Sequence, residues 1–218
     1  MGKRIGAGYA RMTRTDWDER YDRAEYLFGE EPSDFLRRHA EIVKERSSAL
    51  AVADGEGRNG VWLAEQGLAV HSIDASAIGL GKAQALAKSR GVSITTEVVD
   101  LAEYDWPDEH FDIVVGIFIQ FAGPALRDAI FAGMIKALRP GGTLLLHGYR
   151  PEQLAFGTGG PRTEENLYTE ALLEKAFQTL TITSLLSYDA EIAEGTGHHG
   201  MSALIDLVAT KPLELARA

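Results

Sequence analysis

The chain has 218 residues and a net charge of −10 at pH 7, because 32 acidic residues outnumber 22 basic ones. It has no basic surface for phosphates and no cysteine, and no apolar run approaches the roughly 20 residues of a membrane span. We therefore expect no nucleic-acid partner, no disulfide and no membrane partner, and we predict a cytoplasmic protein with one domain over residues 1–218.

The first 47 residues precede the first strand of the predicted core. Residues 1–14 are predicted to form a flexible tail, and residues 15–47 an N-terminal helical cap of one or two helices. Trp17, Tyr21 and Tyr26 in this cap either close over a ligand or pack an amphipathic helix against the core. The residue pattern leaves both interpretations open.

From residue 48 onward, apolar runs alternate with helix-like stretches, a pattern typical of a parallel sheet covered by helices. A turn at "RPGG" precedes the fifth strand, and a glycine-rich loop, "FGTGGPR", follows it. The predicted strands span 48–54, 69–74, 93–100, 111–119, 143–149, 179–189 and 202–211. The predicted helices span 59–66, 77–90, 125–138 and 169–177.

The turn after the first strand, "AVADGEGRNG", contains a G-x-G-x-x-G pattern in Gly55, Gly57 and Gly60. This pattern is typical of a pyrophosphate site, but it also fits a plain tight turn. Asp54 and Glu56 would oppose a pyrophosphate by about 1 kcal/mol each in water and about 4 kcal/mol in a half-buried site. The same two acids favour S-adenosylmethionine, which carries a sulfonium and an ammonium group.

Acidic residues also end the next two predicted strands. Asp74 can accept hydrogen bonds from two ribose hydroxyls, a role that serves a dinucleotide and S-adenosylmethionine equally. Asp100 can accept from an adenine amino group while Leu101 packs on the ring, or it can cap a turn. The predicted cofactor-binding residues are Asp54, Gly55, Glu56, Gly57, Asn59, Asp74, Ala75, Asp100, Leu101, Ile117, Tyr21 and Tyr26.

Four segments in this order resemble the class I S-adenosylmethionine-dependent methyltransferases: "VADGEGRN", "VHSIDAS", "VVDLAEYDWPDEHFDIVVGIFIQF" and "ALRPGGTLLLHGY". A narrower resemblance, to tellurite-resistance-like small-molecule methyltransferases, rests on "WDERYDRAEYLFGEEPSDFL", "PEQLAFGTGGP" and "EGTGHHGMSALIDLVATKP". The resemblance implies an α/β fold with a Rossmann-like, doubly wound seven-stranded sheet whose last strand is antiparallel. It divides the chain into a cofactor-binding half, residues 48–150, and an acceptor-side half, residues 151–218.

The chain departs from the commoner family pattern at two places. Ala51 and Ala53 stand where the usual loop has an acid and a glycine, so Asp54 takes over the acidic role. Gln120 stands where many relatives have a histidine, and an amide has no useful pKa for proton transfer.

On the acceptor side, we expect Gln120, His147, Tyr149 and Arg150 to face the cleft from the ends of the fourth and fifth strands. His147 fits a core histidine equally well, and Arg150 fits either an anionic acceptor or a surface ion pair.

His198 and His199 are predicted to lie in the loop between the last two strands. Adjacent side chains rarely bind one ion, so we expect no metal. His198 matches the H-x-G motif of the narrower group, and this resemblance implies an acceptor-side role, for example as a general base.

The predicted function is S-adenosylmethionine-dependent methyl transfer to a small-molecule acceptor by in-line displacement, with His198, Gln120, Tyr149 and Arg150 as the catalytic set. The alternatives are a non-catalytic module that binds S-adenosylmethionine and, less favoured by the loop acids, a nucleotide-dependent oxidoreductase.

Overall fold

Seven strands form one mixed sheet in the computed structural model, which describes residues 14–213. They are β1 (Ser48–Val52), β2 (Ala69–Asp74), β3 (Thr95–Val98), β4 (Phe111–Ile117), β5 (Leu138–Tyr149), β6 (Thr181–Glu194) and β7 (His198–Thr210). Their order is β3-β2-β1-β4-β5-β7-β6. The first five strands pair in parallel, whereas β7 is antiparallel to both β5 and β6. This arrangement confirms the predicted doubly wound sheet with an antiparallel last strand.

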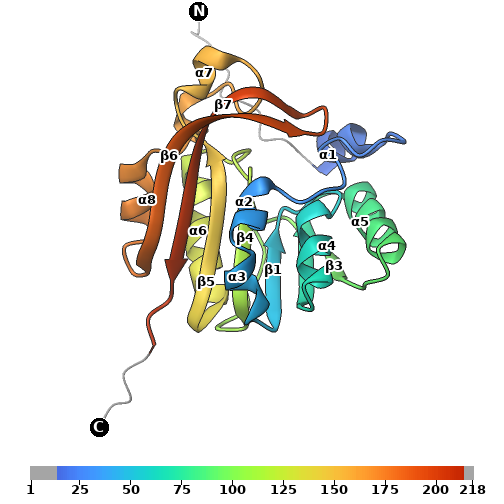
Figure 1. Ribbon diagram of the computed structural model, residues 1–218, viewed down its shortest axis with the longest axis horizontal. Helices are drawn as coiled ribbons and strands as arrows, with labels where there is room; N and C mark the ends of the chain where they lie inside the picture. The colour runs from blue at the N-terminus through green and yellow to red at the C-terminus, as the bar shows by residue number, and fades with distance from the viewer. Residues whose placement is uncertain (1–13, 214–218) are drawn as a thin grey trace, which may run out of the picture.

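Helices lie on both faces of this sheet (Figure 1). They are α1 (Arg14–Tyr21), α2 (Asp34–Arg38), α3 (Ala40–Lys44), α4 (Arg58–Glu65), α5 (Ala77–Ser89), α6 (Pro124–Ala137), α7 (Gln153–Phe156), the 3-10 helix η1 (Glu164–Asn166) and α8 (Glu170–Ala176). Several begin at residues that suit a helix start. Ser33, Ser76 and Thr169 are N-caps whose hydroxyls accept backbone N–H bonds, and Pro124 stands in the first turn of α6.

Each face of the sheet has its own apolar core. Phe131 of α6 and Phe177 beside α8 pack on one face, with their ring centroids 4.8 Å apart. Phe35 and Leu36 of α2 and Leu63 of α4 pack on the other. Because helices cover both faces, every residue of β4 is buried, which explains why the strand is apolar apart from Asp112.

The N-terminal cap is more divided than the sequence indicates. It consists of three short helices, α1, α2 and α3, with irregular chain over residues 22–33. Arg14, predicted as part of the tail, is the first residue of α1, and the rest of the predicted tail lies outside the described residues. In Figure 1, α2 and α3 lie in front of the sheet, while α1 lies beside α5.

The predicted "RPGG" turn is part of strand β5, which begins at Leu138. Gly141, with φ +78°, donates to the Lys211 carbonyl at 2.8 Å, and the Lys211 N–H donates to the Gly142 carbonyl at 2.9 Å. Gly141 thus forms an irregular turn within β5, which stays paired on both sides of it. The predicted turn is correct, but the predicted start of the strand at residue 143 is wrong.

The β6–β7 hairpin is longer than predicted, and its tip comprises only residues 195–197. His198 and His199 are therefore the first residues of β7 and not part of a loop, which corrects the prediction. The hairpin crosses above the carboxyl ends of the parallel strands and reaches toward α1 (Figure 1). The N–H groups of Thr196 and Gly197 donate to the Leu27 carbonyl at 3.0 and 3.1 Å. The tip of the hairpin and the segment at Leu27 thus form a joint roof.

Among the described helices, none has the length and apolar character required to cross a membrane.

Candidate active site

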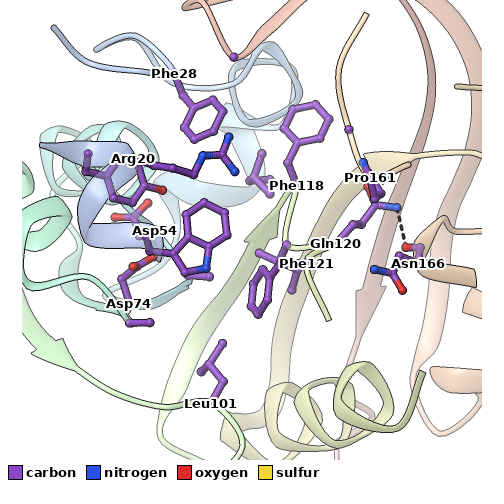
Figure 2. Close-up of a pocket in the computed structure, with 18 of the residues that line it drawn as sticks. Arg20, Phe28, Asp54, Asp74, Leu101, Phe118, Gln120, Phe121, Pro161 and Asn166 are labelled. Carbon is purple, nitrogen blue, oxygen red and sulfur yellow. Dashed lines mark hydrogen bonds between the residues drawn. The ribbon is translucent and has the colours of Figure 1, made fainter. Parts of the chain in front are cut away.

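A cavity of about 800 Å³ lies under this roof, at the carboxyl ends of β1, β2 and β4 (Figure 2). Open α/β sheets bind their ligands at this edge. The turns after these strands form its floor, α1 forms one wall, and residues 160–163 form the opposite wall. Gly197 and His198 of the hairpin line its upper part.

The glycine turn shapes the site of one carboxylate. Asp54 accepts hydrogen bonds from the Gly60 N–H at 3.2 Å and from the Ser72 hydroxyl at 2.5 Å. A Cβ atom at Gly60 would overlap the Asp54 carboxylate. The third glycine of the pattern therefore leaves room for an acid, not for a phosphate.

Two carboxylates meet at this end of the cavity, Asp54 and Asp74 (Figure 2). Asp74 accepts from the Gly55 and Ser76 N–H groups, both at 2.8 Å. Burial raises the pKa of Asp54 to about 7, and the charge of Asp74 raises it further. Burial likewise raises the pKa of Asp74 to about 6. Two buried acids with raised pKa values would be stabilised by a cation, so the donor set fits a cationic ligand.

Glu56 and Tyr26 lie outside the cavity, although the sequence predicts cofactor contacts for both. Glu56 is buried, with Oε1 2.5 Å from Nζ of Lys82 and Oε2 accepting from the Leu27 N–H at 2.7 Å. The Tyr26 hydroxyl donates to the Lys82 carbonyl at 3.1 Å. The left-handed turn through Gly55 and Gly57 directs Glu56 toward α5, where it fastens residues 22–31 and cannot contact a ligand.

Gly55 and Gly57 serve close packing in the same turn and do not line the cavity. Gly55, with φ +57°, lies under Tyr21, whose hydroxyl oxygen would be 2.5 Å from a Cβ at this position. Gly57, with φ +86°, packs against Ala83 of α5. Both positions require glycine because the conformation is left-handed and the space is filled.

An apolar pocket continues from the acids along the floor of the cavity. Asp100 lines it, and its Oδ1 also accepts from the Ala102 N–H at 2.9 Å, so it caps a turn as well. Asn59 lines the cavity while its Oδ1 accepts from the Ser33 N–H at 3.0 Å. The other lining residues of this part are Ala75, Val98, Val99, Leu101, Ile117, Ile119, Phe121 and Leu126.

Helix α1 contributes Trp17, Arg20 and Tyr21 to the wall (Figure 2). The Trp17 and Tyr21 rings stack with centroids 5.8 Å apart, and the Arg20 guanidinium lies 4.9 Å from the Trp17 ring. Asp18 accepts from the Ser76 hydroxyl at 2.6 Å and from the Ile78 N–H at 3.2 Å. This carboxylate holds α1 against the start of α5, so the wall has a fixed position.

Four aromatic side chains gather at the end of the cavity away from the acids. The His198 ring lies 4.1 Å from the Phe118 ring, 4.5 Å from the Phe28 ring and 5.8 Å from the Tyr149 ring. Phe118 follows β4 with φ +55°, a strained conformation for a bulky residue and one that concentrates at functional sites. Sequence reasoning missed Phe28 and Phe118; for Phe118, the position directly after β4 was the available signal.

Two buried polar atoms at this end have no hydrogen-bond partner, the Tyr149 hydroxyl and Nδ1 of His198. Tyr149 is 1% exposed and His198 is 8% exposed. Burial lowers the pKa of His198 to about 3, and the charge of Arg58 lowers it further. The imidazole is therefore neutral, and burial also keeps the Tyr149 hydroxyl protonated by raising its pKa. Both side chains line the cavity, and buried polar groups without a partner are uncommon enough to suggest that a ligand binds beside them.

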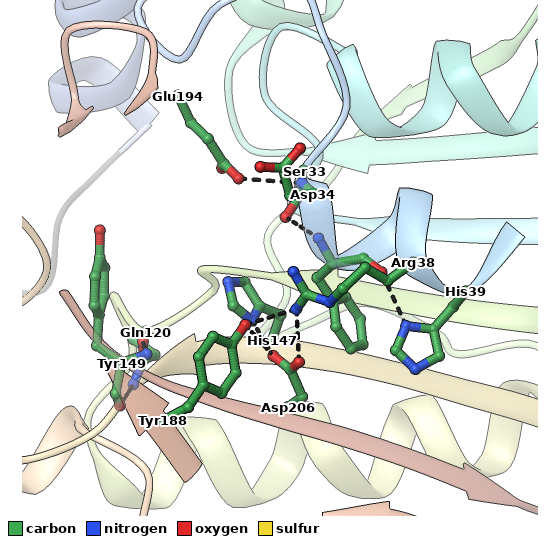
Figure 3. Close-up of polar contacts among 11 residues, drawn as sticks. Ser33, Asp34, Arg38, His39, Gln120, His147, Tyr149, Tyr188, Glu194 and Asp206 are labelled. Carbon is green, nitrogen blue, oxygen red and sulfur yellow. Dashed lines mark hydrogen bonds and ion pairs between the residues drawn. The ribbon is translucent and has the colours of Figure 1, made fainter. Parts of the chain in front are cut away.

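The Gln120 side chain links the ends of β4 and β5 through hydrogen bonds to the backbone. Its Nε2 donates to the Tyr149 carbonyl at 2.8 Å and to the Asn166 carbonyl at 3.2 Å, and its Oε1 accepts from the Tyr149 N–H at 2.6 Å (Figures 2 and 3). An amide supplies the donor and the acceptor that this backbone pairing requires. Gln120 lines the cavity, but these bonds give it a positioning role and no proton to transfer.

His147 and Arg150, both expected in the cleft, lie outside the cavity. Nδ1 of His147 is 2.6 Å from Oδ1 of Asp206, and its ring stacks on Phe35 at 5.2 Å (Figure 3). His147 is thus a satisfied core histidine. Arg150 forms ion pairs with Asp189 and Glu152, so it follows the surface interpretation.

The roof is fastened by an ion pair that the sequence did not indicate. Arg58 Nη2 lies 2.6 Å from Oε2 of Glu194, and both side chains are nearly buried. The other Glu194 oxygen accepts from the Asp34 N–H at 3.3 Å (Figure 3). No local pattern connects residues 136 positions apart. Within residues 14–213, no group of three or more His, Asp or Glu side chains is placed to hold a metal.

The sheet order and the carboxyl-end cavity define the class I methyltransferase fold. Residues 49–142 match the family described as a methyltransferase domain. Over these residues the chain is similar to methyltransferase domains, and this match agrees with the S-adenosylmethionine cofactor that the sequence predicts. No curated protein matches the chain by sequence.

Several solved structures share the fold. One, from work on the conversion of a disulfide bond into a thioacetal group during echinomycin biosynthesis, is 17% identical with a TM-score of 0.71, covering 89% of this chain and 87% of that one. The N-methyltransferase NodS from Bradyrhizobium japonicum, in complex with S-adenosyl-L-homocysteine, is 16% identical with a TM-score of 0.67, covering 91% and 98%. TehB from Haemophilus influenzae is 16% identical with a TM-score of 0.65, covering 91% of this chain but 66% of that one. At these identities the likeness shows the fold alone.

Proposed function

We propose that the protein transfers a methyl group from S-adenosylmethionine to a small-molecule acceptor. The observation that carries the proposal is a single roofed cavity with an acid pair at one end and two unpaired buried polar atoms at the other. A volume of about 800 Å³ is near the upper end of the usual range for small-ligand sites, roughly 300–1,000 Å³. It supports a cofactor together with a small acceptor.

Different residues along the cavity would bind different parts of the cofactor. Asp54 would bind the cofactor's ammonium group, Asp74 the ribose hydroxyls, and Asp100 and Leu101 the adenine. Asn59, Ala75, Ile117 and Tyr21 complete this set. When bound, the cofactor supplies an electrophilic methyl group on its sulfonium. Such a group needs an aligned nucleophile and a dry site more than it needs protein side chains that react.

At the other end, Phe28, Phe118 and the hairpin tip exclude water, while Gln120 fixes the backbone of Tyr149. Tyr149 and His198 would contact the acceptor. A histidine with a pKa of about 3 is a weak base at neutral pH, so a donor or positioning role for His198 replaces the general-base role considered from the sequence.

A non-catalytic module that binds S-adenosylmethionine is the second candidate. The unpaired Tyr149 hydroxyl and His198 ring favour a second ligand and thus favour the enzyme. Membership of the tellurite-resistance-like group remains a prediction, supported by the likeness of the fold to TehB. A cytoplasmic location remains a prediction as well.

Calorimetry with S-adenosylmethionine, S-adenosylhomocysteine and NAD tests the cofactor assignment. We expect both adenosyl compounds to bind and NAD to show no heat. Methyl transfer from labelled cofactor to a panel of small acceptors then separates the enzyme from the module. Binding of NAD in place of the methyl donor would contradict the proposal.

A further inference from the structure

We propose that the acceptor is a small carboxylic acid, bound as its carboxylate between Arg20, His198 and Tyr149 and methylated on a carboxylate oxygen. This inference rests on the proposed function and goes further, because it names the chemistry of the second ligand. Four features of the aromatic end lead to it, namely its hydrogen-bond donors, its charge, its lack of a base and its apolar walls.

The hydrogen-bonding groups at this end are donors. Nδ1 of His198 is sealed from solvent without a partner, and a buried unpaired N–H costs more than a buried unpaired lone pair. The proton of the neutral ring is therefore assigned to Nε2, and His198 lines the cavity. The Tyr149 hydroxyl is the second donor without a partner.

The charge at this end is positive. Arg20 lines the cavity and reaches toward Phe118, on the side away from Asp74 (Figure 2). Besides burial, the charges of Arg58 and Arg20 lower the pKa of His198 while that of Glu194 raises it, so all three lie within electrostatic reach of its ring. Arg58 is paired with Glu194 and Arg14 with Asp18, and the exposed Arg162 also lines the cavity. The three acids that line the cavity, Asp54, Asp74 and Asp100, belong to the cofactor end.

No described group at the aromatic end is an effective base near neutral pH. The imidazole of His198 stays neutral near pH 7, the Gln120 amide is held by backbone bonds, and Glu194 is paired with Arg58. A carboxylate is already ionised at this pH and needs no base. Its oxygen forms the new O–CH₃ bond as the S–CH₃ bond breaks, the bonding pair passes to sulfur, and no proton leaves. The products are a methyl ester and S-adenosylhomocysteine.

The walls around these donors are apolar and close together. Phe28 and Phe118 flank the His198 ring, and Pro161 lines the opposite side (Figure 2). Rings at these positions stack on a flat ligand better than on a branched one. The body of the acid is therefore expected to be small, flat and apolar.

Binding of matched probes to the protein saturated with S-adenosylhomocysteine tests the inference without turnover. Benzoate and benzamide have the same shape and differ in charge. Benzoate is expected to bind about tenfold or more tightly than benzamide, because charge-assisted hydrogen bonds are stronger than neutral ones. Arg20→Gln should remove this preference. Arg23→Gln, which changes an exposed arginine outside the cavity, should keep it.

Three results would overturn the inference while leaving the proposed function standing. The first is that benzamide binds as tightly as benzoate. The second is that Arg20→Gln keeps the preference for benzoate and the affinity for S-adenosylhomocysteine. The third is that Arg20→Gln keeps the preference but binds S-adenosylhomocysteine more weakly. The last result would assign Arg20 to the carboxylate of the cofactor. Failure of S-adenosylhomocysteine itself to bind would instead contradict the proposed function.

The reaction product gives an independent test. Protein incubated with labelled cofactor and benzoate is expected to form labelled methyl benzoate, which mild alkali converts to labelled methanol. A labelled product that resists alkali, or transfer to neutral acceptors alone, would contradict methylation of the carboxylate.

Discussion

The two ends of the cavity differ in the charge of the ligand that they would stabilise. At the acid end, burial raises the pKa values of Asp54 and Asp74, so each carboxylate is costly until a cation arrives. At the aromatic end, burial and Arg58 lower the pKa of His198, so the ring stays neutral and leaves the positive charge to the arginines. One end is prepared for a cationic cofactor and the other for a ligand without positive charge. The predictions below test this division, from the largest expected effect to the smallest.

Gly60→Ala should break the acid end while leaving the aromatic end intact. The added Cβ overlaps the Asp54 carboxylate, so the acid must leave its place. We expect affinity for S-adenosylhomocysteine to fall by about 100-fold, since roughly 1.5–3 kcal/mol is at stake for a bond to a charged group. Titration calorimetry measures the change. Gly81→Ala in α5, where a Cβ meets open space, is the control and should bind normally.

Asp74→Asn tests the second carboxylate. The amide keeps one oxygen for the Gly55 or Ser76 N–H but loses the charge, so cofactor affinity should fall about tenfold. This change is cleaner than Asp74→Ala, which would also free both backbone groups. The exposed Asp22→Asn serves as a control outside the cavity. Unchanged affinity in Asp74→Asn would remove this residue from the site.

The pH dependence of cofactor binding should follow the acid pair. Raised pKa values mean that the ligand-free protein loses stability as pH rises from about 4 to 7, because these acids ionise freely in the unfolded chain but stay protonated in the folded one. An ammonium group favours the ionised form, so affinity for S-adenosylhomocysteine should rise about tenfold between about pH 5.5 and 7.5. Asp54→Asn should flatten this profile. Affinity that is constant or falls over this range would contradict the prediction.

Tyr149→Phe tests whether the Tyr149 hydroxyl binds the acceptor at the aromatic end. Its unpaired buried hydroxyl is a cost, so the ligand-free variant should gain about 1 kcal/mol in urea unfolding and bind benzoate a few fold more weakly. Tyr168→Phe is a matched control, since its hydroxyl is also buried and unpaired but does not line the cavity. It should gain stability without any change in benzoate binding. Equal losses of benzoate binding in both variants would contradict the assignment of Tyr149.

The acid end was the more predictable of the two because its contacts are local. Gly55 and Asp74 are 19 residues apart and belong to one strand–helix–strand unit, and both strand ends follow from apolar runs and glycine turns. Even here, Glu56 was predicted to bind the cofactor but lies outside the cavity, because its side chain pairs with Lys82 and the Leu27 N–H.

The aromatic end depends on where distant segments meet. Phe28, Phe118, Tyr149 and His198 come together only when the β6–β7 hairpin folds over the sheet and the N-terminal segment meets its tip. A prediction of His198 in a loop followed from its neighbouring glycines, yet the ladder with β6 continues to the pair of Glu194 and His198. The central strands were predictable, since β1 and β4 are largely apolar runs that precede turn residues, whereas the edge strand β3 is polar and shorter than predicted.

The fastening of the hairpin tip has a kinetic consequence. Gly195 approaches so closely that a Cβ there would lie 2.5 Å from the Gly29 nitrogen, and two N–H bonds to Leu27 and the Arg58–Glu194 pair complete the closure. These contacts are few, and none of them involves the strands of the parallel sheet. We therefore expect the roof to open locally without unfolding of the domain, and the time for which a ligand stays bound to depend on how often it opens.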